Sequence, residues 1–260
     1  MIKITLPDGS VKEFASGVTP MEVAKSISEG FARNVISASF NGTTVETTTP
    51  LTTDGSLILY TWNDEDGKKA FWHSTSHVMA QVLEQMYPGI KLTLGPAIAN
   101  GFYYDVDFEE HKITEADFKK IEDRVLEISR GKHEFKLRPV SKADALELYK
   151  DNVYKTEMIT NLEDGTITFC DHDTFTDLCR GGHIPNTGII KAMKIMSVAG
   201  AYWRGDEKNK QLTRVYGTSF PKQKDLTEYL ALLEEAKRRD HRKLGKELEL
   251  FAFSQKVGQG

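Results

Sequence analysis

The first sixty residues change from a strand pattern to a helix pattern and back to strands, and few small folds accommodate that order. Apolar residues alternate along residues 2–6 up to the turn Pro7-Asp8-Gly9, and a second short strand pattern follows, which predicts a β-hairpin. Thr19-Pro20-Met21-Glu22 then combines a capping residue, a first-turn proline and an early acid. This combination predicts that a helix begins there.

Further strands follow this helix. Val35, Ala38 and Phe40 lead to the turn Asn41-Gly42, and residues 57–60 form another β-rich run. Strand, strand, helix, strands is the order of a small β-grasp, ubiquitin-like domain. We assign this domain to residues 1–62.

A polar stretch at residues 63–69 comes next, and its composition predicts a solvated, partly helical connection. Beyond it, an apolar helix face runs to Pro88-Gly89, and His73 and His77 lie at the start of this helix. Because the two histidines are four residues apart, their imidazoles are expected on one side of the helix.

We assign residues 63–225 to one larger domain. Thr114-x-x-Asp117 predicts the capped start of a long amphipathic helix, and a second helix is predicted from Ser141 to Lys150. Short apolar runs separated by turns follow up to Tyr216. Helices and strands are thus segregated and do not alternate, so the predicted fold class is α+β. Residues 226–260 form the last predicted part, a helical linker.

The net charge of −4 gives no general attraction to nucleic acid, so any RNA contact must come from local basic patches. One candidate is the basic run in the last helix pattern, with Arg238, Arg239 and Arg242; the alternative is a solvated helix face. The chain has two cysteines and no long apolar run or signal-peptide pattern. We therefore expect a cytoplasmic protein with reduced thiols and no membrane contact.

Two short motifs carry groups that could do chemistry. His73-Ser-Thr-Ser-His77 and Cys179-Arg-Gly-Gly-His183 each separate two nitrogen or sulfur ligands by three residues. Four such groups brought together would satisfy the tetrahedral preference of zinc, so a zinc-binding hydrolase or a structural zinc module is one interpretation. The first motif lacks the Glu of H-E-x-x-H, which disfavours a metallopeptidase. The other interpretation is that the histidines are capping or surface residues.

The second motif lies in a segment, Asp177 to His183, that joins an acid, a thiol, a cation and an imidazole through two glycines. Such a loop allows the backbone to approach a ligand closely and leaves amide groups free to hold an oxyanion. The alternative is a tight turn whose polar side chains only cap it.

The two motifs occur together with four others, Leu94-Gly95-Pro96, Asn100-Gly101-Phe102-Tyr103-Tyr104-Asp105, Gly200-Ala201-Tyr202-Trp203-Arg204-Gly205-Asp206 and Arg214-Val215-Tyr216-Gly217. Together these resemble the editing domain of bacterial-type threonyl-tRNA synthetases. The His/Cys pairs are also similar to those of alanyl-tRNA synthetase editing domains, but the preceding β-grasp segment resembles the TGS domain of the threonyl family.

The resemblance extends over the whole chain, because residues 237–245 are similar to the linker that leads into the catalytic domain of that family. The aminoacylation core and the anticodon-binding domain have no counterpart in the 260 residues. The resemblance therefore implies no cofactor here, with zinc and ATP-Mg expected only in the missing core. It also implies that the full-length enzyme is a homodimer through that core.

Ester hydrolysis needs a proton shuttle and a positive charge beside developing negative charge, so we predict catalytic roles for His73 and Lys155. Residue by residue, the resemblance implies that His73 lines the pocket and that Lys155 matches the editing lysine of the family. It implies that the remaining site residues bind the substrate, namely His77, Tyr104, Asp177, Cys179 and His183. Among them, Asp177 is suited to binding the ammonium group of serine. Gly182 departs from the R-G-P-H sequence common in the family, and the glycine is expected to loosen the loop.

The implied function is the editing of mischarged tRNA. Serine lacks only one methyl of threonine, a difference worth about 1–3 kcal/mol, so a second pocket is needed to hydrolyse the wrong ester. The expected partner is the acceptor end of tRNA(Thr) carrying serine, with attack by water. A Cys179–His183 nucleophile pair and a non-catalytic tRNA-binding module remain alternatives.

Overall fold

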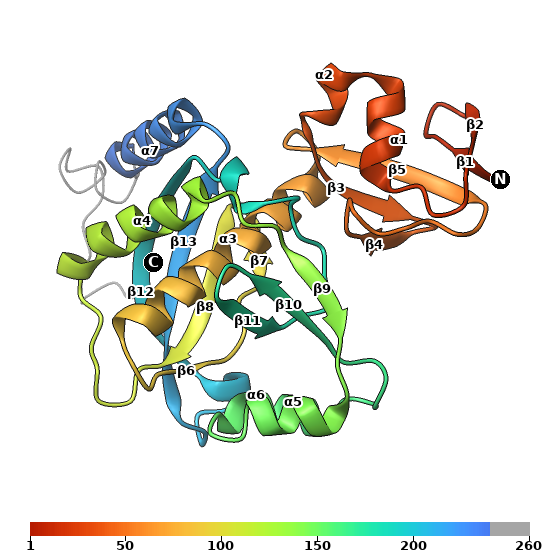
Figure 1. Cartoon of the computed structure of the whole chain (residues 1–260). Helices are drawn as coiled ribbons and strands as arrows, with labels where there is room; N and C mark the ends of the chain where they lie inside the picture. The colour runs from red at the N-terminus through yellow and green to blue at the C-terminus, as the bar shows by residue number, and fades with distance from the viewer. Residues whose placement is uncertain (240–260) are drawn as a thin grey trace, which may run out of the picture. The chain divides into compact units, whose positions relative to one another are not determined.

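A computed structural model of the chain describes residues 1–239, and these divide between two units, Met1–Pro221 and the segment beginning at Lys222. The first unit contains the β-grasp module (residues 1–62) and a larger α+β part (Figure 1).

The β-grasp module is confirmed. Its sheet has the order β2-β1-β5-β3-β4, with β1 and β5 parallel and the other pairs antiparallel. Val23 of the first helix is fully buried and packs with Ile4 and Leu57 of the sheet. The predicted cap is present, because Thr19 and Glu22 exchange hydrogen bonds in a capping box. The elements are β1 (Ile2–Thr5), β2 (Val11–Phe14), α1 (Pro20–Ile27), α2 (Glu29–Ala32), β3 (Val35–Phe40), β4 (Thr43–Val45) and β5 (Gly55–Thr61).

The connection to the larger part is shorter than predicted. Helix α3 runs from Glu65 to Met86, so most of the polar stretch is helical, and His73 lies in the middle of the helix and not at its start. Gly67 makes this start possible: a Cβ there would lie 2.0 Å from the carbonyl oxygen of Thr61, at the end of β5. The helix therefore begins directly against the β-grasp module.

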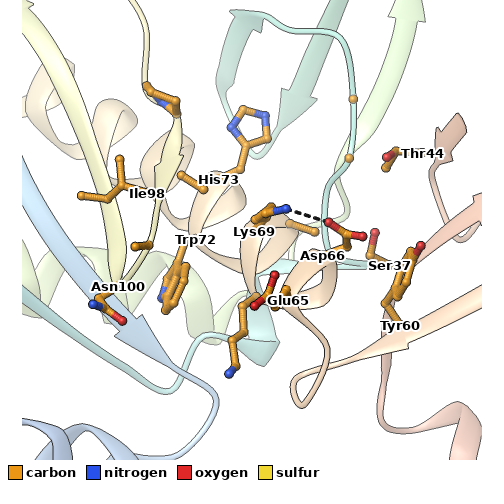
Figure 2. A pocket seen from close by; sticks show the side chains of 17 residues that line it. Ser37, Thr44, Tyr60, Glu65, Asp66, Lys69, Trp72, His73, Ile98 and Asn100 are labelled. Carbon is orange, nitrogen blue, oxygen red and sulfur yellow. Dashed lines mark hydrogen bonds and ion pairs between the residues drawn. The ribbon is translucent and has the colours of Figure 1, made fainter.

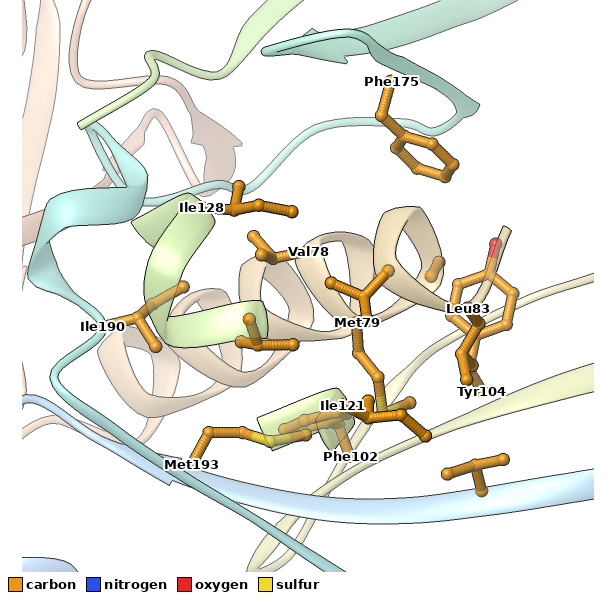
Figure 3. Packing of buried hydrophobic residues seen from close by; sticks show 14 of the residues in the cluster. Val78, Met79, Leu83, Phe102, Tyr104, Ile121, Ile128, Phe175, Ile190 and Met193 are labelled. Carbon is orange, nitrogen blue, oxygen red and sulfur yellow. The ribbon is translucent and has the colours of Figure 1, made fainter. Parts of the chain in front are cut away.

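The larger part contains a sheet of the order β12-β13-β8-β6, with β7 paired to β8. Helix α3 packs on β8 and helix α4 packs on β12, and the two helices contact each other. Between them lies the main core, where Met79, Phe102 and Ile121 are fully buried (Figure 3). The elements are β6 (Lys91–Leu92), β7 (Ala97–Ile98), β8 (Gly101–Asp107), α4 (Glu115–Arg130), β12 (Ala192–Tyr202) and β13 (Gln211–Phe220). The predicted cap of α4 at Thr114 is confirmed.

A second sheet of the order β11-β10-β9 carries the other half of the site. In its antiparallel register Cys170 lies opposite Asp177, and β11 ends one residue before Cys179. The elements are β9 (Lys136–Pro139), α5 (Lys142–Leu148), α6 (Val153–Thr160), β10 (Thr168–His172) and β11 (Phe175–Leu178), with short 3-10 turns at Thr187–Ile189 and Trp203–Gly205. These segregated helices and sheets confirm the α+β class.

The second unit begins with helix α7 (Gln223–Arg238). Arg239 caps this helix and pairs with Glu235, whereas Arg242 lies outside the described residues. None of the helices in residues 1–239 combines the length and the apolar character that crossing a membrane requires.

Candidate functional site

The structure brings both predicted motifs together. Helix α3 supplies His73 and His77, and the chain after β11 supplies Cys179 and His183. One nitrogen or sulfur atom from each of the four lies within 4.8 Å of the others. His73 Nε2 is 3.1 Å from Cys179 Sγ and 3.3 Å from His77 Nε2, and Cys179 Sγ is 3.3 Å from His183 Nε2. Of the four, His73 alone is partly exposed.

The second nitrogen of each imidazole faces an oxygen outside the cluster. His77 Nδ1 is 3.0 Å from Asp177 Oδ2, and His73 Nδ1 is 3.3 Å from the carbonyl oxygen of Gly95. His183 Nδ1 is 2.9 Å from Oε1 of Glu46. Three Nε2 atoms and one thiol sulfur therefore lie close together, and this donor set suits zinc.

Asp177 connects this cluster to Lys155. Its Oδ1 accepts a hydrogen bond from Lys155 Nζ, and its Oδ2 accepts one from the Tyr104 hydroxyl at 2.6 Å. Asp177 is 2% exposed and Lys155 is 1% exposed. Burial alone would raise the pKa of Asp177, but the charge of Lys155 and the bond from His77 outweigh burial and hold this pKa well below its usual range. Asp177 is thus ionised and already paired, so a substrate ammonium would have to share it with Lys155.

Cys179 and His183 form a second polarised pair. Burial would raise the pKa of the Cys179 thiol, but the charges and hydrogen bonds of the surrounding imidazoles hold it well below its usual range. Burial would lower the pKa of His183, but bonds to Cys170, Cys179 and Glu46 raise it well above its usual value. The two shifts favour the same state, a thiolate beside an imidazolium.

A cavity of about 420 Å³, called here the inner cavity, opens onto this network. Its polar lining includes His73, His77, Lys155, Asp177 and Cys179. Its apolar walls include Leu94, Pro96, Met158 and Leu162.

A larger cavity of about 860 Å³, called here the outer cavity, shares His73, Pro96 and Gly181 with the inner one. Figure 2 shows Trp72, Lys69 and Asn100 around it, with Tyr60 of the β-grasp module on the other side. His73 therefore lies where the two cavities meet.

Two predicted substrate-binding residues do not line either cavity. Tyr104 is fully buried behind Gly95, where an added Cβ would lie 2.3 Å from the tyrosine ring. His183 is also fully buried, behind Cys179. Tyr104 and His183 pack behind residues that line the inner cavity. They do not form its wall themselves, because β8 and the loop after β11 direct these two side chains into the core.

The glycine loop (residues 179–183) differs from its prediction. Gly181 and Gly182 have φ angles of +98° and +89°, values that proline cannot adopt. The amides of Gly182 and His183 are not free for an oxyanion, because they donate to Glu46 at 3.0 Å and 3.1 Å. The loop is therefore anchored to Glu46. Sequence reasoning missed Glu46, which lies 137 residues before His183 and in no motif with it.

Two family models match the chain. The model described as "TGS domain" matches residues 2–61, and the model described as "Threonyl and Alanyl tRNA synthetase second additional domain" matches residues 166–216. The second match contains Asp177, Cys179 and His183.

The chain is also similar to curated proteins along its whole length. Threonine–tRNA ligases of Flavobacterium johnsoniae, Cytophaga hutchinsonii and Bacteroides thetaiotaomicron are 89%, 57% and 52% identical to it, over 100% of this chain in each case and 40%, 41% and 41% of the relatives. It thus spans about two fifths of their length. With the β-grasp module, the His/Cys cluster and both family models in agreement, the chain is similar along its whole length to part of the threonine–tRNA ligases.

Proposed function

We propose that the inner cavity edits mischarged tRNA by hydrolysing the ester that joins serine to the terminal ribose of tRNA(Thr). The observation that carries this proposal is the position of His73: it is the partly exposed member of a buried cluster, and it lies where the two cavities meet. An aminoacyl group in the inner cavity would place its ester beside this imidazole. The outer cavity leaves room for the nucleotide end.

In the proposed reaction a water molecule attacks the ester carbonyl while His73 accepts its proton. The bond from the carbonyl carbon to the ribose oxygen then breaks, and His73 returns the proton to that oxygen. Serine and free tRNA result. Because Glu46 occupies two amides of the glycine loop, we assign the stabilisation of the developing negative charge to Lys155, which lines the inner cavity.

Selection against threonine would come from the walls of the inner cavity. One extra methyl group in a tight pocket changes binding by about 1–3 kcal/mol, which corresponds to roughly 10–200-fold in rate. The test is single-turnover deacylation of matched seryl- and threonyl-tRNA by this chain. We expect seryl-tRNA to be hydrolysed much faster. Equal hydrolysis of both would refute selective editing of serine, and absent hydrolysis of both would refute the proposal and favour a non-catalytic tRNA-binding module.

A zinc-dependent hydrolase is the second candidate, and the convergence of three Nε2 atoms and Cys179 Sγ favours it. His73, His77, Cys179 and His183 would hold the ion, and a bound zinc would supply an activated water. Our proposal is that editing runs without a metal. Metal analysis of the purified chain, followed by deacylation after chelator treatment, separates the two: stoichiometric zinc and loss of activity on its removal would support the second candidate.

A further inference from the structure

The β-grasp module contributes one buried side chain to the candidate site. Glu46 follows β4 and is 8% exposed, although the module is a separate match to the TGS family model. Its carboxylate accepts hydrogen bonds from Gly182 N at 3.0 Å and His183 N at 3.1 Å, and lies 2.9 Å from His183 Nδ1. All these partners belong to the glycine loop of the larger part.

Glu46 orients the imidazole ring of His183. A carboxylate beside Nδ1 can only accept, so Nδ1 must carry the hydrogen. Nε2 is thereby directed at Cys179 Sγ, 3.3 Å away, and that sulfur is in turn 3.1 Å from His73 Nε2. The carboxylate thus lies at the end of a continuous chain of contacts that reaches the proposed proton shuttle.

The same carboxylate holds the backbone of the loop. Two consecutive positive φ angles, at Gly181 and Gly182, turn neighbouring amides toward one anion. The approach is close, because a Cβ on Gly181 would lie 3.1 Å from Glu46 Oε1 and a Cβ on Gly182 would lie 3.3 Å from Thr44 Cγ2. The two glycines therefore suit the close packing of this loop against the β-grasp module.

We propose that Glu46 is a positioning residue of the editing site, which fixes the orientation of the His183 ring and the shape of the glycine loop. The β-grasp module is then part of the catalytic apparatus and not only a separate binding domain. This inference rests on the proposed function for its kinetic consequence, but its structural consequence can be measured independently.

The experiment compares Glu46→Ala and Glu46→Gln in the whole chain, with Glu13→Ala as a matched control because Glu13 is an exposed acid of the same module. We expect Glu46→Ala to lower the single-turnover rate for seryl-tRNA by about 10–100-fold, the usual effect of losing a group that orients a site histidine. The affinity for tRNA should not change. Glu46→Gln keeps the shape of the side chain and one acceptor oxygen, so its single-turnover rate should lie between those of wild type and Glu46→Ala.

Nitrogen NMR of the His183 ring supplies the second measurement. The wild-type chain should show a slowly exchanging proton on Nδ1. Glu46→Ala should lose this signal while the signals of the β-grasp core persist, and Glu46→Gln should show it with faster exchange than wild type. Unchanged His183 signals in Glu46→Ala would overturn the proposal whatever the rates. If the wild-type chain hydrolyses neither ester, the proposed function fails, and the ring signals alone decide the role of Glu46.

Discussion

Breaking the buried pair of Lys155 and Asp177 should destabilise the fold as well as slow the reaction. In Lys155→Met the methionine fills the space of the lysine stem, but Asp177 remains buried without its cation. Removing one partner of a buried ion pair commonly costs about 3–5 kcal/mol. The Tyr104 hydroxyl and His77 still lie beside Asp177, so we expect the free energy of unfolding to fall by the lower value, about 3 kcal/mol at neutral pH.

The contribution of Asp177 to the pH dependence of stability should have the opposite sign in this variant and should appear at a higher pH. In the wild-type chain the folded-state pKa of Asp177 lies below its unfolded value of about 4. This carboxylate therefore stabilises the fold above that value, and its contribution is lost as the pH falls toward the folded-state pKa. In Lys155→Met burial should instead raise the pKa of Asp177, so protonation on acidification should stabilise the variant relative to its value at neutral pH.

The assay is urea unfolding of wild type, Lys155→Met and the double variant Lys155→Met with Asp177→Asn, at pH 7.5 and 5.5. The double variant removes the unpaired charge, so it should recover most of the lost free energy of unfolding at neutral pH. The reasoning is refuted if Lys155→Met unfolds within about 1 kcal/mol of wild type at pH 7.5, or if the double variant is no more stable than the single one.

Three further outcomes are expected. His73→Ala should lower seryl-tRNA deacylation by at least about 100-fold with an unchanged circular dichroism spectrum, because the side chain is polar and partly exposed; a near-wild-type rate would contradict its role. Gly182→Pro should lower the free energy of unfolding by about 1–3 kcal/mol, since it loses the amide that donates to Glu46 and cannot adopt a φ of +89°; an unchanged melting temperature would count against the anchored loop. Charge reversal at Arg238 and Arg239 should reduce the slope of log K for tRNA binding against log salt concentration by roughly one for each lost phosphate contact. An unchanged slope would assign the basic run of this helix to a solvated helix face.

The sequence by itself determined what depends on neighbours along the chain. The hairpin, the capped helix at Thr19 and the capped helix at Thr114 follow from turns, caps and periodicity, which act within a few residues. The same local geometry placed His73 and His77 on one side of a helix. The family resemblance, not periodicity, pointed to Lys155 as part of the same site.

Only the tertiary structure decided which groups satisfy one another. Buried charges must find partners wherever packing brings them, so Lys155 pairs with Asp177 across two elements, and Glu46 reaches His183 from another module. Neither pairing leaves a regular spacing in the sequence. Packing likewise placed Tyr104 behind the cavity wall and not in it, because neighbouring positions cannot tell whether a side chain faces the cavity or the core.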